Sequence, residues 1–254
     1  MPSSDALIRT SALVRHNFVL MIREPGPLLS RLCMPLVFIT LLRPLYISAQ
    51  GQTAGTQQAV IGTLVTFSLL ALSISSQAIL TERLGRTWDR LRSTPLRPAE
   101  MLVGKAVPVF TVLFAQQALV IVFGIWAFGL RVAHPLLLVS VLINWSFTLL
   151  GLGALLGVLA RSVGELSAAY DIGGMLLSSL GGALVPLDVL PHWVGVIGPF
   201  TPGYWAVRGL HTALTGDTTA VLTVCVTLLG MAAACGTLAS HRLRRRSGRA
   251  VALQ

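Results

Sequence analysis

The chain has 254 residues, of which 54% are hydrophobic and only 11% are charged, and its mean hydropathy is +0.77. So few charged residues cannot cover the surface of a water-soluble fold of this size, which excludes a soluble globular domain. The net charge of +10 would suit a nucleic-acid-binding protein, but the basic residues cluster where juxtamembrane charges meet anionic lipid headgroups. We therefore expect a membrane protein that contacts lipid and no nucleic acid.

The first 26 residues carry the pattern of an amphipathic helix. Leu7 and Phe18 fall on one helical face, whereas Arg9 falls on the opposite face. This pattern predicts a cytoplasmic helix over residues 1–26 that lies along the inner leaflet. The alternative is a leader helix with no role beyond anchoring. Pro25-Gly26-Pro27 is expected to break the helix before the chain enters the membrane.

Six stretches come close to the roughly 20 apolar residues that a helix needs to cross a bilayer. They are residues 28–47, 57–80, 105–129, 135–160, 166–186 and 218–240. The sequence therefore predicts an all-α integral membrane protein with six transmembrane helices and no separate soluble domain. We expect a transmembrane domain over residues 27–240, followed by a basic cytoplasmic tail over residues 241–254.

The distribution of basic residues predicts the orientation of these spans. Of the 19 lysines and arginines, only Arg43, Arg131 and Arg208 fall on one side of the predicted spans, and the other 16 fall on the opposite side. Cytoplasmic loops carry the excess of basic residues. Both termini are therefore expected in the cytoplasm.

A short amphipathic helix is predicted in the connection between the second and third spans. Leu84, Trp88 and Leu91 have the spacing i, i+4, i+7 and share one helical face, while Arg86 and Arg90 lie beside them. The apolar face could rest on lipid headgroups, or it could enter a groove on a soluble partner.

Polar side chains inside the third, fourth and fifth spans are candidates for a substrate path, because polar groups at bilayer depth are costly. These residues are Gln116, Gln117, Asn144 and Asp171. Amides at depth also tie helices together, and Asp171 could lie at the cytoplasmic interface, so substrate contact is one of several roles open to them.

Small residues inside the spans predict close helix packing rather than substrate contact or metal binding. The cysteines lack the spacing of a metal site, so we expect no bound metal. The residues concerned are Cys33, Cys225, Cys235, Gly151, Gly153, Gly157, Gly173, Gly174, Gly181 and Gly182.

The segment between the fifth and sixth spans combines prolines with aromatic residues. Prolines favour broken helices and aromatic rings favour headgroup depth, so this segment is expected at a membrane interface. Pro186, Pro191, Trp193 and Tyr204 are the residues we assign to an outer gate. An ordinary outer loop with an aromatic belt is the alternative.

One motif resembles a known family. The motif is the run Glu82–Pro95, ERLGRTWDRLRSTP, followed by Gly104-Lys105. It resembles the signature loop of ABC type-2 transporter membrane subunits, and its DRLRSTP part is most similar to the daunorubicin-exporter branch. The resemblance extends over nearly the whole chain, and in that family the segment after the fifth span resembles a short re-entrant hairpin over the outer end of the pathway.

The resemblance implies a half-transporter that pairs with a second permease subunit, identical or sister, and with cytoplasmic ABC ATPase subunits. In similar permeases the loop after the second span docks on the ATPase, which implies a coupling role for Leu84, Arg86, Trp88, Arg90 and Leu91. The chain has no G-x-x-x-x-G-K-[ST] sequence. We therefore expect no enzyme activity or cofactor on this chain, and ATP and magnesium on the partner ATPase.

The function implied by the resemblance is export through the bacterial plasma membrane, as in multidrug efflux and antibiotic resistance. We expect a hydrophobic drug or a lipid-like, amphipathic compound as cargo, and a lipid-linked polysaccharide is the alternative. An intramembrane enzyme would need paired catalytic groups at depth, and an ion-coupled secondary transporter would show repeated halves. The sequence shows neither pattern.

Overall fold

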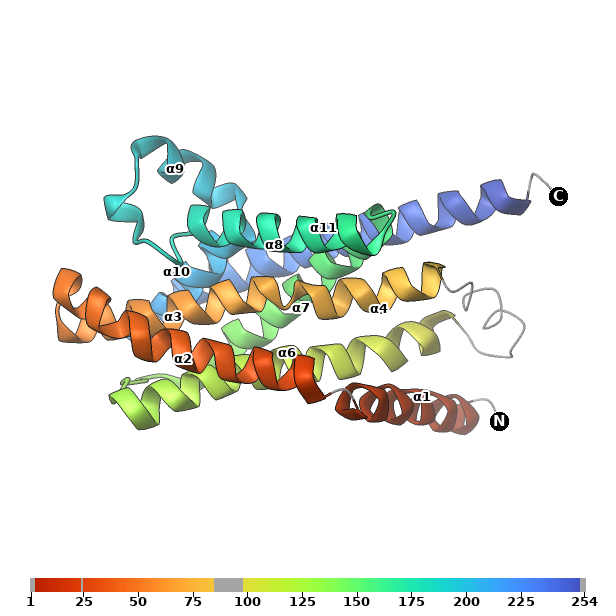
Figure 1. Cartoon of the computed structure of the whole chain (residues 1–254), viewed down its shortest axis with the longest axis horizontal. Coiled ribbons are helices and arrows are strands. Elements are labelled where there is room, and N and C mark those ends of the chain that lie inside the picture. The colour runs from red at the N-terminus through yellow and green to blue at the C-terminus, as the bar shows by residue number, and fades with distance from the viewer. Residues whose placement is uncertain (1–2, 24, 85–97, 252–254) are drawn as a thin grey trace.

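The computed structural model describes residues 3–23, 25–84 and 98–251, and these residues form helices without any strand (Figure 1). The α-helices are α1 (Ser3–Arg23), α2 (Pro25–Gln50), α3 (Gln52–Leu70), α4 (Leu72–Leu84), α6 (Pro98–Phe128), α7 (Pro135–Leu159), α8 (Val163–Leu180), α9 (His192–Ile197), α10 (Pro202–Thr215) and α11 (Thr218–Val251). Two 3-10 turns, η1 (Leu187–Val189) and η2 (Gly198–Phe200), flank α9. The predicted all-α class is confirmed.

Five helical stretches in the described part of the chain are long and apolar enough to cross a bilayer. They are Leu28–Gln50, Gln52–Gln77, Val103–Phe128, Pro135–Leu159 and Thr218–Arg242. These stretches match five of the six predicted spans. The predicted span 166–186 is not among them, because α8 ends at Leu180 and its 18 residues include two acids and three serines.

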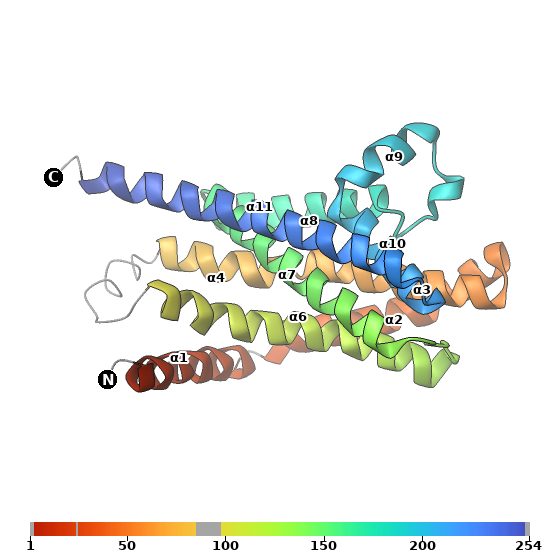
Figure 2. The same cartoon turned by 180° about the vertical axis from the view of Figure 1, so that it is seen from behind.

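The two ends of the bundle are distinct (Figures 1 and 2). The start of α1, the end of α4, the start of α6 and the end of α11 lie at one end, which we call the inner end in accordance with the predicted orientation. The turn from α2 to α3, the turn from α6 to α7, and α9 lie at the opposite, outer end.

The second apolar stretch forms the centre of the molecule. α3 packs against α2, α6, α8 and α10, and α4 packs against α7 and α8. In an 18-residue window of Gln52–Gln77, 89% of the residues are buried, against 11% in the window of Leu28–Gln50. The central stretch is interrupted at Ala71, between the end of α3 at Leu70 and the start of α4 at Leu72. The low burial of Leu28–Gln50 places α2 at the periphery of the bundle.

Glycines of α7 let neighbouring helices approach closely, as predicted. A methyl group added at Gly157 would lie 2.6 Å from the carbonyl oxygen of Ser76 in α4, and one at Gly151 would lie 2.7 Å from that of Ala232 in α11. Such contacts are closer than side-chain carbons make, so only glycine fits there. The glycines of α8 differ, since Gly173 has open space around it.

The predicted N-terminal helix is present as α1 and packs against α6. The Asn17 amide Nδ2 donates a hydrogen bond of 3.0 Å to the carbonyl oxygen of Gly104. A methyl group added at Gly104 would lie 2.9 Å from the Leu13 Cβ atom. The helix is thus attached to the inner part of α6, directly after the segment 85–97, which lies outside the described residues.

The segment after α8 departs from the connection expected in the sequence. Residues 202–215 form α10, which packs against α3, α7, α8 and α11, and its residues Ala206, Leu210 and Ala213 are fully buried. Pro202 stands in the first turn of the helix, where a missing N–H is harmless, and the Thr201 side chain caps it. A helix of the core therefore replaces much of the predicted loop.

Candidate functional site

The predicted coupling residues lie mostly outside the described part of the chain. Leu84 is the last residue of α4. Arg86, Trp88, Arg90 and Leu91 fall within residues 85–97, which the structure does not describe. Their docking on an ATPase stays a prediction.

Gln116 and Gln117 lie deep between helices, with 2% and 1% of their surface exposed. The Gln117 Nε2 atom donates a hydrogen bond of 3.0 Å to Ser146 Oγ, which ties α6 to α7. This bond is the helix-tying role that amides play at bilayer depth. The Oε1 atoms of both glutamines have no hydrogen-bond partner among the described residues.

The other two predicted path residues have different surroundings. The Asn144 Nδ2 atom donates within its own helix to the Ser140 carbonyl oxygen, at 2.7 Å. Asp171 is exposed on α8. Because Gln116 and Gln117 are fully enclosed while Asp171 faces outward, the four residues do not line one open path in this conformation. Their contact with substrate stays a prediction.

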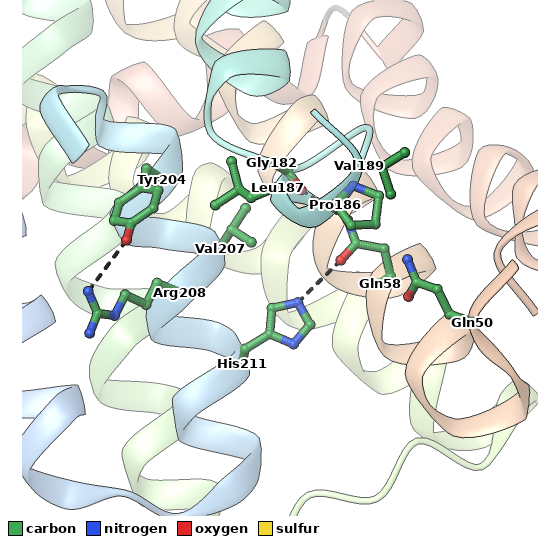
Figure 3. A pocket seen from close by; sticks show the side chains of 10 residues that line it. All are labelled: Gln50, Gln58, Gly182, Pro186, Leu187, Val189, Tyr204, Val207, Arg208 and His211. Carbon is green, nitrogen blue, oxygen red and sulfur yellow. Dashed lines mark hydrogen bonds between the residues drawn. The ribbon is translucent and has the colours of Figure 1, made fainter. Parts of the chain in front are cut away.

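A cavity of about 400 Å³ lies at the outer end, between the end of α2, the start of α3, the turn after α8, and α10 (Figure 3). Its lining residues are Gln50, Gln58, Gly182, Pro186, Leu187, Val189, Tyr204, Val207, Arg208 and His211. The volume lies within the range of small-molecule sites, which is about 300–1,000 Å³.

Gln58 joins three elements at the base of this cavity. Its Nε2 atom donates to the carbonyl oxygens of Gly182 and Ala183, at 3.0 and 3.1 Å, and its Oε1 atom lies 3.3 Å from His211 Nε2 (Figure 3). Since the amide nitrogen already donates, Oε1 is the acceptor and His211 Nε2 carries the hydrogen. Burial lowers the pKa of His211 below its usual value, which favours this neutral form.

Arg208 supplies the positive charge of the cavity. It is exposed, and its Nη1 atom lies 3.5 Å from the Tyr204 hydroxyl (Figure 3). Its guanidinium carbon lies 5.7 Å from the centre of the Trp205 ring. Trp205 is held in turn by a hydrogen bond of 2.7 Å from its Nε1 atom to the Pro199 carbonyl oxygen.

The structure brings together only part of the predicted outer gate. Pro186 and Tyr204 line the cavity. Pro191 precedes α9 and is not a lining residue, and Trp193 of α9 is 57% exposed. The gating role of all four residues stays a prediction.

Sequence reasoning missed four polar residues that line the cavity: Gln50, Gln58, Arg208 and His211. A signal for two of them was available. Tyr204, Arg208 and His211 have the spacing i, i+4, i+7, which places them on one helical face. The prolines and aromatic residues around these positions instead favour a broken connection, which hides this periodicity.

Arg31 was also missed. It lies in the first apolar stretch, and its Nη2 atom donates a hydrogen bond of 2.6 Å to Ser73 Oγ, close to the junction of α3 and α4. A charged side chain at this depth needs such a partner, because unsatisfied polar groups are costly in lipid.

Comparisons with known proteins agree with the helical architecture. A family profile described as ABC-2 type transporter matches residues 9–215. The linearmycin resistance permease protein LnrN of Bacillus subtilis (strain 168) is 23% identical over 185 residues, which cover 72% of this chain and 48% of that protein. A protein of Escherichia coli (strain K12) named "Probable multidrug ABC transporter permease YbhR" is 28% identical over 122 residues, which cover 48% of this chain and 33% of that protein. The chain thus matches half or less of the length of these relatives.

Proposed function

Because this chain belongs to the ABC-2 type transporter membrane family, we propose that it is the permease subunit of an ATP-driven exporter. The family match over residues 9–215 carries this proposal, since it runs from α1 to the end of α10. A permease of this kind must cross the membrane several times, and the five long apolar helices fit that requirement.

We propose a hydrophobic drug or a lipid-like, amphipathic compound as cargo. The names of the two relatives support this class, because one is a linearmycin resistance permease and the other a multidrug permease. A lipid-linked polysaccharide is the alternative cargo, and neither name favours it. The outer cavity supports a cargo that is partly apolar, since Pro186, Leu187, Val189 and Val207 form much of its wall.

The energy would come from cytoplasmic ABC ATPase subunits that bind ATP and magnesium. The chain has no G-x-x-x-x-G-K-[ST] sequence, so we place hydrolysis on a separate subunit. A second permease subunit, identical or sister, would complete the transporter. The apolar side chains that α2 exposes, such as Leu41 and Leu45, could face this subunit or lipid.

Dye efflux from bacterial cells tests the proposal. Cells that express the chain together with its ATPase should accumulate less of a hydrophobic fluorescent dye than cells that express either alone. Replacing the P-loop lysine of the ATPase with alanine should abolish the difference. Efflux that survives this replacement but stops when the proton gradient is collapsed would contradict an ATP-driven exporter and favour a secondary transporter.

A further inference from the structure

The outer cavity has a polar side and an apolar side, and the distribution of charge between them is uneven. Arg208 is the one permanently charged side chain among the described lining residues, and burial lowers the pKa of His211, which favours the uncharged ring. No described acidic side chain lines the cavity. A site of this kind attracts an anion and repels a cation.

Several hydrogen-bond donors around the cavity are free for a ligand. The Arg208 guanidinium has five N–H groups, and its single side-chain hydrogen bond within the described residues is the long one to Tyr204. Gln50 lies on the opposite side of the cavity, beyond His211 and Gln58 (Figure 3), so the donors for a charged head group come from Arg208. A guanidinium with unused donors matches the geometry of a carboxylate or a phosphate, which it binds through two parallel hydrogen bonds.

Gln58, at the base of the cavity, has no free donor for a ligand. Its amide nitrogen donates to two backbone carbonyls, and its oxygen accepts from His211. It therefore stabilises the shape of the cavity rather than offering donors to a ligand. The ligand's charged part must then lie on the side of Arg208, and its uncharged part against Leu187, Val189 and Val207.

The geometry points to a binding site for the anionic head of an amphipathic molecule, a carboxylate or phosphate carried on an apolar chain. The head would lie against Arg208, and the first part of the chain against the apolar wall of Leu187 and Val207. A cavity of about 400 Å³ holds a head group with a short part of its chain and not a large molecule as a whole. The same head group could belong to exported cargo or to a lipid of the outer leaflet, and we infer that it belongs to cargo, which rests on the proposed export function.

Binding to the isolated chain tests the site without any ATPase. The purified protein is placed in nanodiscs of phosphatidylcholine and titrated with a fluorescently labelled fatty acid, and in parallel with an analogue whose carboxylate is replaced by an amine. The carboxylate probe should bind at least about tenfold more tightly than the amine, because a hydrogen-bonded charge pair is worth that much or more. Equal affinities would overturn the site.

Substitutions locate the binding. Arg208→Gln should weaken the carboxylate probe by about tenfold or more, and Arg208→Lys should weaken it less, because lysine keeps the charge but loses the paired donors. Arg131→Gln is the matched control, since Arg131 is likewise exposed, lies in the connection between α6 and α7, and does not line the cavity. If the Arg131 and Arg208 variants lose the same affinity for the carboxylate probe, the effect comes from general surface charge and the site is overturned.

Two further measurements show whether the head group belongs to exported cargo or to a membrane lipid. Nanodiscs that contain phosphatidylglycerol should leave the affinity of the carboxylate probe nearly unchanged if the site takes cargo. If the anionic lipid displaces the probe from the wild-type protein, the occupant is a lipid and the cargo assignment is overturned. If the wild-type chain and its ATPase show no ATP-driven dye efflux but the carboxylate probe still binds in an Arg208-dependent way, the export function is contradicted and the binding site is supported.

Discussion

At the scale of single residues, Gln58 connects three elements at the outer end. It is 4% exposed and connects α3 to the Gly182–Ala183 turn and, through His211, to α10. Gln58→Ala leaves two backbone carbonyls and one imidazole N–H without partners, and each unsatisfied buried group costs about 1–3 kcal/mol. We expect a lower thermal unfolding temperature, measured by intrinsic fluorescence on the purified protein.

Gln57→Ala is the control for this change. Gln57 is the neighbouring glutamine in α3, it is partly exposed, and its side chain has no hydrogen bond to a described residue. Its replacement should leave the unfolding temperature nearly unchanged. If both variants unfold at the same temperature as the wild type, the hydrogen bonds of Gln58 do not stabilise the outer end.

Trp88 is the residue at which the coupling hypothesis can be separated from the lipid-surface alternative. If its ring fills a groove on the ATPase, Trp88→Ala should cost about 2 kcal/mol or more, roughly a thirtyfold loss of affinity. The ATPase should then fail to co-purify. If the ring rests on headgroups, the spanning helices still hold the protein in the membrane and co-purification is unchanged.

Trp126→Ala provides the comparison for Trp88→Ala. Trp126 is 84% exposed near the outer end of α6, far along the chain from the predicted coupling helix. Its replacement removes the same aromatic side chain without touching a cytoplasmic partner. Equal loss of the ATPase in both variants would mean that the loss reflects the removal of any tryptophan, not docking at Trp88.

At the scale of helices, close contact between α4 and α7 depends on glycine. Gly157→Ala places a methyl group 2.6 Å from the Ser76 carbonyl oxygen, a backbone atom that moves only with its helix. Overpacking of this kind typically costs about 1–3 kcal/mol. We expect a lower thermal unfolding temperature and a weaker yield of folded protein in detergent.

The matched change is Gly173→Ala in α8, where nothing lies within 4 Å of the added methyl group. Alanine is the better helix former by about 1 kcal/mol in a helix interior, so this variant should be neutral or slightly more stable. The two variants make the same chemical change. A stable Gly157→Ala protein would show that α4 and α7 separate without cost.

At the scale of the whole molecule, the two ends of the bundle should face opposite sides of the membrane. In a protein whose Cys33, Cys225 and Cys235 are replaced, single cysteines at Thr53 and Thr215 should react with an impermeant thiol reagent in intact cells, because both positions are exposed at the outer end. A cysteine at Ser247 of α11 should react only after the cells are opened. Labelling of Ser247→Cys in intact cells would reverse the orientation.

Local composition determined much of this architecture from the sequence. Five of the predicted spans coincide with long apolar helices, because hydropathy is a property of each stretch by itself. The loop motif between the second and third spans indicated the family that the profile over residues 9–215 confirms. The fifth span, 166–186, was not confirmed because α8 carries two acids, and α10 was missed because it begins with Pro202 and carries polar residues such as Arg208 and His211.

The tertiary structure alone decided which helices are central and which residues meet. The stretches Leu28–Gln50 and Gln52–Gln77 have nearly the same hydropathy, 1.7 and 1.9, yet the first is mostly exposed and the second mostly buried. In lipid an inward and an outward side chain are equally apolar, so no periodic pattern marks the face that packs. The cavity unites Gln50 with His211, and only the packing of α10 against α3 brings residues so distant in the chain together.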